Sequence, residues 1–366
     1  MPGSFAKGEI KMKLKRIFAA IAASAMLLGA AGCSSEAPAS ITVKNIPDSP
    51  GVLRGMDNLN TIKTSQERQK LNKVYKIGIA KLMDHPALNL SEEGFVKALE
   101  DSGFVIDGNL ILDYRNGGGD NDALDAIAGE FVENKNDLIF AIATPAAQAC
   151  ANKTTSIPII ATAVTDFVDA GLVDSNARPS TNVSGTTDMS PIEEQIDLMR
   201  NIFPDVKTVG FVYTASESNS VVQINSARKY AESKGLSAVE MTINTSADIE
   251  RVFSEIVTQC DAIYLPTDNL LASEIPAVAA VCNPAQIPVF CAESGMVESG
   301  GFGTLGIDYY DLGYQAGLMA VKVLVDGSAI DRMSIQKATK YEYCFNGRTI
   351  EALGVTLPAE YQDYII

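Results

Sequence analysis

Histidine is the scarcest chemistry-bearing residue of this 366-residue chain, with His85 as the only one. One histidine excludes metal sites built from several imidazoles and leaves a Ser-His-Asp triad dependent on one position. The sequence also has no Gly-x-Ser-x-Gly nucleophile motif, and none of its six cysteines forms a C-x-x-C pair. We therefore expect no cofactor, no metal and no enzymatic activity.

Basic residues are also few: the chain has 29 lysines and arginines and 45 acidic residues, which gives a formal net charge of −16. Proteins that bind nucleic acid need a basic face, so a nucleic-acid partner is not expected. Five cysteines besides Cys33 cannot all pair, and Cys150, Cys260 and Cys291 stand in apolar contexts. The sequence predicts buried free thiols rather than a disulfide framework.

Long hydrophobic runs are absent, because the apolar stretch Ile17 to Leu28 has only about twelve residues against the ~20 that span a bilayer. Lys13, Lys15 and Arg16 precede it, and small residues lead from it to Cys33. This is the pattern of an export signal ending in a lipobox. We expect a lipoprotein anchored through Cys33 to the outer face of a bacterial cytoplasmic membrane, with cleavage after Ala23-Ser24-Ala25 as the alternative.

The rest of the chain divides into a tether and two lobes. Small and polar residues over 34–73 indicate a flexible tether after the leader and signal peptide of 1–33. From Val74 onward, short β-branched runs alternate with amphipathic stretches, which is typical of parallel α/β sheets. The fold class is therefore α/β, with two doubly wound parallel-sheet lobes joined by a hinge. One lobe comprises residues 74–188 plus about 309–332, and the other 189–308 plus about 333–366.

Polar residues gather directly after the predicted strands. Ligands of open α/β sheets bind beyond the carboxyl ends of the strands, so these loops are the candidate binding site. The candidate ligand-binding residues are His85, Thr144, Pro145, Ala146, Gln148, Thr165, Asp166, Tyr213, Ser216, Asn219, Ser220, Asp268, Asn269, Glu293 and Asp308.

These loops also carry a family resemblance. From about Val74 to the end, the chain resembles the ABC-transporter substrate-binding proteins of the tryptophan/tyrosine-binding type. The resemblance lies in His85-Pro86-Ala87-Leu88, Ala143-Thr144-Pro145-Ala146-Ala147-Gln148, Ala163-Val164-Thr165-Asp166, Gly171-Leu172-Val173, Asn182-Val183-Ser184-Gly185, Glu217-Ser218-Asn219-Ser220 and Pro266-Thr267-Asp268-Asn269. The chain departs from the family pattern at Asn89, where aspartate is usual, and at Phe167, where proline is usual.

The resemblance implies a type I periplasmic-binding-protein fold whose lobes are joined by three strands. It also implies an ABC permease and its ATPase as partners, and a small-molecule ligand, with an aromatic amino acid favoured. For such a zwitterion, the helix start at Thr144, Ala146 and Ala147 suits the carboxylate, and Asp268 or Asp308 would hold the ammonium. An exported hydrolase using the same cleft and a ligand-sensing domain are the alternative functions.

Overall fold

The computed structural model describes residues 73–366. The predicted signal peptide, Cys33 and most of the tether lie outside the described residues. Between residues 73 and 366, no helix combines the length and the apolar character needed to cross a bilayer.

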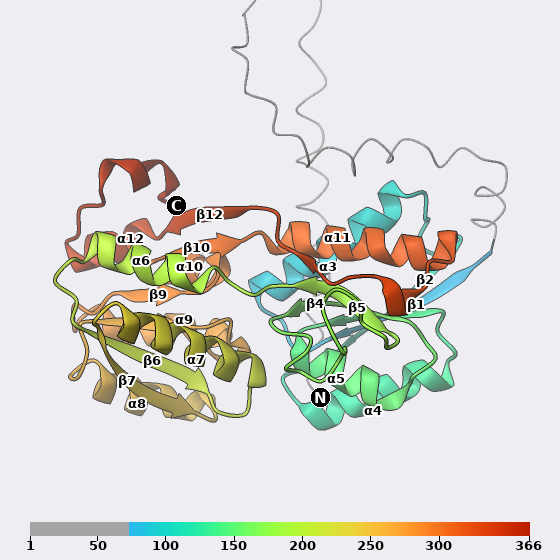
Figure 1. Cartoon of the computed structure of the whole chain (residues 1–366), viewed down its shortest axis with the longest axis horizontal. Helices are drawn as coiled ribbons and strands as arrows, with labels where there is room; N and C mark the ends of the chain where they lie inside the picture. Colours follow the sequence, from blue (N-terminus) through green and yellow to red (C-terminus); the bar gives the residue numbers. More distant parts are fainter. Residues whose placement is uncertain (1–72) are drawn as a thin grey trace, which may run out of the picture. The chain divides into compact units, whose positions relative to one another are not determined.

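The first lobe is built on a six-stranded sheet with the order β11-β5-β4-β3-β1-β2. All of its strand pairs are parallel. Helices α3 and α11 pack together on one face, and α4 and α5 pack together on the other (Figure 1). The strands are β1 (Tyr75–Lys81), β2 (Leu110–Asn116), β3 (Leu138–Ile142), β4 (Ile159–Val164), β5 (Val183–Thr187) and β11 (Gln336–Lys337). The helices are α3 (Pro86–Asp101), α4 (Asn121–Glu133), α5 (Thr144–Lys153) and α11 (Tyr309–Val321), the last continuing into η2 (Lys322–Asp326) and followed by η3 (Ile330–Arg332).

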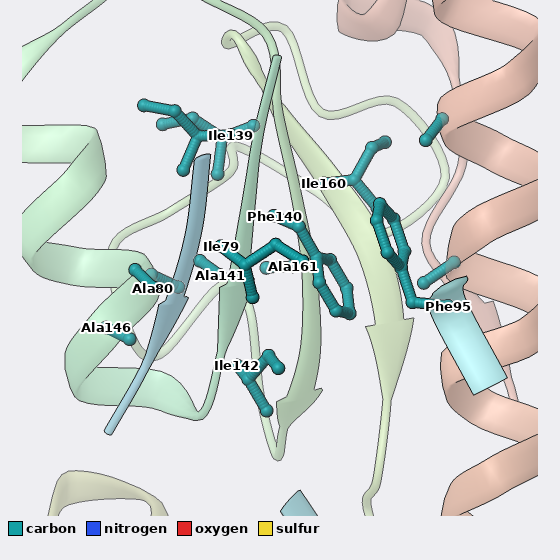
Figure 2. Packing of buried hydrophobic residues seen from close by; sticks show 14 of the residues in the cluster. Ile79, Ala80, Phe95, Ile139, Phe140, Ala141, Ile142, Ala146, Ile160 and Ala161 are labelled. Carbon is teal, nitrogen blue, oxygen red and sulfur yellow. The ribbon is translucent and has the colours of Figure 1, made fainter. Parts of the chain in front are cut away.

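The core of the first lobe forms where apolar strands are covered on both faces. Every residue of β3 is buried, as expected for a central parallel strand. Phe140 of β3 stacks on Phe95 of α3 with the ring planes 6° apart, and both are shown in Figure 2. Helix α11 approaches α3 so closely that a Cβ on Gly313 would lie 1.9 Å from the carbonyl oxygen of Ser91.

The second lobe has the sheet order β12-β10-β9-β8-β6-β7, in which only the edge pair β10–β12 is antiparallel among the described strands. The strands are β6 (Thr208–Thr214), β7 (Ser237–Ile243), β8 (Ala262–Leu265), β9 (Val289–Cys291), β10 (Gly303–Ile307) and β12 (Tyr341–Phe345). The helices are α6 (Ile192–Ile202), α7 (Ser218–Ser233), α8 (Ile249–Ile256), α9 (Asn269–Cys282), α10 (Ser294–Glu298) and α12 (Gly347–Leu353), with short turns η1 (Ser246–Asp248) and η4 (Ala359–Tyr364).

Each face of the second sheet has its own core, because successive strand residues point to opposite faces. Phe211 and Tyr264 pack under α6 and α7, whereas Val212 and Leu265 pack under α8 and α9. Cys260, Cys282, Cys291 and Cys344 all lie in the core beneath α8 and α9. The five cysteines of the described chain, which include Cys150 of the first lobe, are buried and free.

The sheets confirm the predicted fold class of two α/β lobes. The chain passes between the sheets three times, after β5, after β10 and after β11. The last passage differs from the predicted division at 333, because Gln336 and Lys337 still pair with Thr186 and Thr187 of the first sheet.

Two serines near helix starts are buried and do not cap a helix. α3 begins at Pro86, whose fixed φ suits a first turn. Ser91 is buried and donates to the carbonyl of Tyr309 at 3.2 Å. Likewise Ser190 does not cap α6, because its hydroxyl donates to the carbonyl of Ala292 at 3.1 Å.

Candidate functional site

A polar cavity with an empty volume of about 310 Å³, including the part open to solvent, lies between the lobes. The first lobe contributes His85, Leu88, Ala163, Thr165, Asp188 and Tyr309. The second lobe contributes Asn219, Thr267, Asp268, Asn269, Ala272 and Glu293. We call this space the inner cavity.

The sheet topology explains why these residues meet. In the first sheet, β2 lies on one side of β1 and β3 on the other, and in the second sheet β7 and β8 flank β6 in the same way. This strand order creates a switch point between β1 and β3 and between β6 and β8. Thr165 and Asp188 directly follow β4 and β5. Glu293 follows β9 in the second lobe. The carboxyl ends of the two sheets therefore supply the cavity walls.

Three polar contacts cross between the lobes around the cavity. His85 Nε2 lies 3.3 Å from Asn269 Oδ1, and Thr165 Oγ1 lies 3.2 Å from Thr267 Oγ1. Gln223 Nε2 of α7 donates to Thr165 Oγ1 at 3.2 Å. The two lobes thus touch through neutral hydrogen-bonding groups, which is the arrangement of a closed cleft.

Buried carboxyl groups dominate the electrostatics of the cavity. Asp188 accepts from Thr165 Oγ1 at 3.1 Å and from the Tyr309 hydroxyl at 2.7 Å, and burial raises its pKa. Glu293 accepts from the backbone N–H groups of Gly295 and Met296, yet burial raises its pKa to about 7. No lysine or arginine lines the inner cavity. The cavity therefore favours a ligand that brings hydrogen-bond donors or positive charge.

Asp268 also lines the cavity, but its four acceptor positions are filled from within its own lobe. Oδ1 accepts from Leu271 N and the Thr214 hydroxyl, and Oδ2 accepts from Thr214 N and the Ser220 hydroxyl. Burial raises the pKa of Asp268, and the backbone N–H groups of Leu271 and Thr214 oppose that rise. Asp268 is thus a fixed helix cap that joins β6, α7 and α9.

The helices that begin at or beside the cavity differ in their N-terminal capping. In the second lobe, Asp268 caps α9 and Glu293 caps α10 with their carboxylates, whereas α7 has no side-chain cap. In the first lobe, Asp308 caps α11, whereas α3 begins after His85 without any side-chain cap, as does α5 beside the cavity after Ala143. Uncapped helix N-termini attract anions. Uncapped helix starts are therefore suited to a ligand carboxylate, and the buried carboxyl groups of Asp188 and Glu293 to an ammonium group.

Three buried polar atoms of the candidate residues have no hydrogen-bond partner among the described residues: His85 Nδ1 and Asn219 Oδ1 at the inner cavity, and Thr144 Oγ1 at the start of α5. Their residues are 8%, 6% and 2% exposed. Buried polar atoms are nearly always paired in folded proteins, so such a group points to a missing partner. All three belong to residues that the sequence predicted for the binding site.

A second space, the outer groove, has an empty volume of about 600 Å³ and shares Asn219 with the inner cavity. Asn121, Asp125, Pro145, Gln148, Ala149 and Asn152 line it from the first lobe. Ser216, Glu217, Ser218 and Asn219 line it from the second. Pro145, Gln148 and Ser216, which the sequence predicted as ligand-binding residues, belong to this groove.

The structure brings six predicted residues together in the inner cavity, namely His85, Thr165, Asn219, Asp268, Asn269 and Glu293. Six others line neither space. Thr144 opens α5, and its buried hydroxyl has no partner in the described chain. Ala146 is buried in the first core, Asp166 accepts from Val168 N and Asp169 N in a turn, and the Tyr213 hydroxyl reaches Glu240. Ser220 donates to Asp268, and Asp308 is an exposed cap that accepts from Asp311 N.

Sequence reasoning missed Asp188 and Tyr309, the hydrogen-bonded pair at two of the interlobe passages. Asp188 directly follows β5, a strand that the sequence analysis did not predict because Val183–Thr187 is rich in Gly, Ser and Thr. A reading of that segment as a strand would have placed Asp188 at its carboxyl end. Leu88, Ala163, Thr267 and Ala272 were also not predicted to line the site.

Two α/β lobes that meet at a polar cavity define a hinged binding protein. The chain belongs to the family of ABC transporter substrate binding proteins, whose sequence profile matches residues 76–364. This is a family of binding proteins and not of enzymes, so the exported hydrolase is set aside.

Relatives of known name support the assignment. The chain is 41% identical over 291 residues to a tyrosine-binding protein of Clostridioides difficile strain R20291, which covers 80% of this chain and 83% of that protein. A solved ABC domain from Streptococcus pneumoniae in complex with L-Trp matches with a TM-score of 0.77 and 32% identity, covering 80% of this chain and 100% of that chain. The ligand-free, open structure of a substrate-binding protein with adhesive properties from Clostridium difficile matches with a TM-score of 0.65 and 42% identity, covering 80% and 99%.

Proposed function

We propose that this protein captures an aromatic amino acid between its lobes and delivers it to an ABC permease with its ATPase. The tyrosine-binding relative and the L-Trp complex support this ligand class. The observation that carries the proposal is the combination of uncapped helix starts and buried carboxyl groups at and beside the inner cavity. An amino-acid zwitterion matches both kinds of group at once.

Asp188 is the proposed partner of the ligand ammonium. Its carboxylate is 3% exposed, lines the inner cavity, and accepts only hydroxyl donors from other side chains in the described chain. Asp268 is saturated by four donors and Asp308 is exposed, so neither keeps the role that the sequence gave them. The ligand carboxylate would lie toward the uncapped start of α5, where Pro145 lines the outer groove that shares Asn219 with the inner cavity and the Thr144 hydroxyl is unpaired in the described chain.

Closure of the cleft completes the proposed mechanism. The lobes, 74–188 plus 309–337 and 189–308 plus 338–366, would move about the three passages between the sheets. The chain matches the L-Trp complex with a higher TM-score than the open, ligand-free relative, although it is less identical to the former in sequence. This difference in TM-score supports a closed conformation for the residues that the structure describes. Ligand would shift the population toward it.

Isothermal titration and thermal shift of the domain from Ser40 onward test the ligand class, with all amino acids, nucleosides and sugars as candidates. We expect stabilisation by tyrosine or tryptophan. Asp188→Asn should weaken that binding at least about tenfold, because a charge-assisted hydrogen bond is worth about 1.5–3 kcal/mol. Asp166→Asn is the matched control, since Asp166 lines neither space. Stabilisation by another class alone would overturn the proposal.

Cys33 is the proposed attachment point of a lipid that holds the protein at the outer face of the cytoplasmic membrane. The support is the sequence pattern of basic residues, a short apolar run and small residues before that cysteine. Two or more acyl chains give stable membrane binding. The full chain expressed in a bacterium should partition into the detergent phase, and Cys33→Ser should move it to the aqueous phase. Equal partitioning of both forms would exclude the anchor.

A further inference from the structure

The single histidine of the chain is fixed at the contact between the lobes. His85 is the N-cap residue of α3, is 8% exposed, and meets Asn269 at the start of α9. Which of its ring nitrogens carries the proton decides what it can offer a ligand.

The amide of Asn269 can be oriented in only one way. Glu217 Oε2 accepts from Asn269 Nδ2 at 2.7 Å and from Asn269 N at 3.1 Å. A flipped amide would set its oxygen against Glu217 Oε2, which already accepts from Asn269 N and from Asn219 Nδ2 and so has no free position for a proton. The Asn269 oxygen therefore faces His85.

The orientation of this amide fixes the histidine tautomer. Asn269 Oδ1 can only accept, so His85 Nε2 must carry the proton, and Nδ1 is left as a bare acceptor. Burial lowers the pKa of His85 to about 4, which keeps the ring neutral at physiological pH. His85 Nδ1 is buried and has no partner in the described chain.

Two apolar residues of the cavity wall stand one helical turn beyond His85 and its partner Asn269. Leu88 of α3 comes three residues after the N-cap His85, and Ala272 of α9 comes three residues after Asn269. Residues three apart lie on the same helix face, and both side chains line the cavity. Asp188 instead follows the end of β5. The proposed ammonium site is therefore supplied by a strand end, and the two apolar residues by helices.

We propose that His85 Nδ1 accepts a hydrogen bond from a polar hydrogen on the ligand ring, the phenol O–H of tyrosine or the indole N–H of tryptophan, and so discriminates against phenylalanine. The inference rests on the proposed function and adds the specificity-determining residue. A site built to bond a ligand hydroxyl rejects the analogue without it, because its buried polar atom is then left unpaired. The expected preference for tyrosine over phenylalanine is about 10- to 100-fold.

Nitrogen NMR of the imidazole tests the tautomer directly, because a tag-free protein has only one histidine to observe. In the ligand-free protein we expect a protonated Nε2 and an unprotonated Nδ1. Tyrosine should shift the Nδ1 resonance, whereas saturating phenylalanine should not. A protonated Nδ1, or equal shifts with both ligands, would overturn the inference.

Ring-substituted ligands and two variants provide the second test. Tyrosine and 4-aminophenylalanine carry a donor, whereas phenylalanine and 4-fluorophenylalanine do not. His85→Leu should reduce the tyrosine-to-phenylalanine affinity ratio by about 10- to 100-fold, and His85→Asn, which keeps an acceptor, should restore part of it. If His85→Leu weakened both ligands by the same factor, His85 would contact the amino-acid backbone and the inference would be wrong. Failure of all four ligands to bind would instead refute the proposed function.

Discussion

Replacement of Asp268 with alanine should destabilise the protein far more than it impairs ligand recognition. The carboxylate receives four hydrogen bonds at 2.7–2.9 Å, two of them from the buried backbone N–H groups of Thr214 and Leu271. The hydroxyl donors can rotate toward other partners, but the two N–H groups cannot. Each orphaned donor costs about 1–3 kcal/mol, so the loss is about 2–6 kcal/mol.

That loss is measurable by calorimetry. For a unit of ~150–250 residues, each kcal/mol lowers Tm by about 2–4 °C, so Asp268→Ala should lower it by about 5–20 °C. Asp308→Ala is the matched control, because Asp308 caps α11 from an exposed position and accepts from one donor, Asp311 N, at 3.1 Å. Its cost is about 0.5–1 kcal/mol. If Asp268→Ala kept the wild-type Tm while losing ligand, Asp268 would face the ligand and the assignment of a structural cap would be refuted.

Two further perturbations probe the charge and the packing of the fold. The pKa of Glu293 is raised from 4.5 to about 7, so the folded state keeps a proton that the unfolded state has lost within this window. The contribution of this group to the stability of the ligand-free protein should therefore fall by about 3 kcal/mol as pH rises from about 4.5 to 7 and then level off. In urea unfolding across pH, Glu293→Gln should lack this fall relative to the wild type, and identical pH profiles of the two proteins would contradict the assignment. Gly313→Ala should destabilise by more than about 1–3 kcal/mol, because its Cβ would lie 1.9 Å from a backbone oxygen of α3. Gly129→Ala in α4, where nothing lies within 4 Å of the new Cβ, should instead stabilise by about 0.5–1 kcal/mol, and similar effects of the two changes on thermal unfolding would refute the close approach of α3 and α11.

Local sequence patterns predicted most of the strands because the central strands are continuous apolar runs. Leu138–Ile142 and Ala262–Leu265 are buried throughout, and such runs bounded by polar loops are recognisable without a structure. Val183–Thr187 was missed because its polar and small residues are buried by tertiary packing. Gly185 lies so close to β4 that a Cβ would sit 1.8 Å from the carbonyl oxygen of Ala161. No local pattern reports that proximity.

The sequence indicates which residues lie near the cavity, but not what each side chain binds there. The rule that ligands bind beyond strand ends points to His85, Thr165 and Asn219, and all three line the inner cavity. Asp268 follows the same rule, yet its oxygens are filled by residues as distant in sequence as Thr214. Whether a carboxylate is free for a ligand depends on such contacts between elements, which the sequence does not display.

The free thiols of the described chain are distributed so that alkylation can report which lobe unfolds. Cys150 lies in the first lobe, while the other four described cysteines lie in one core of the second. Brief alkylation followed by mass analysis would add a single label when the first lobe opens alone and up to four when the second does. The order in which the lobes come apart, and which of them a bound ligand protects, could thus be counted without introducing any probe.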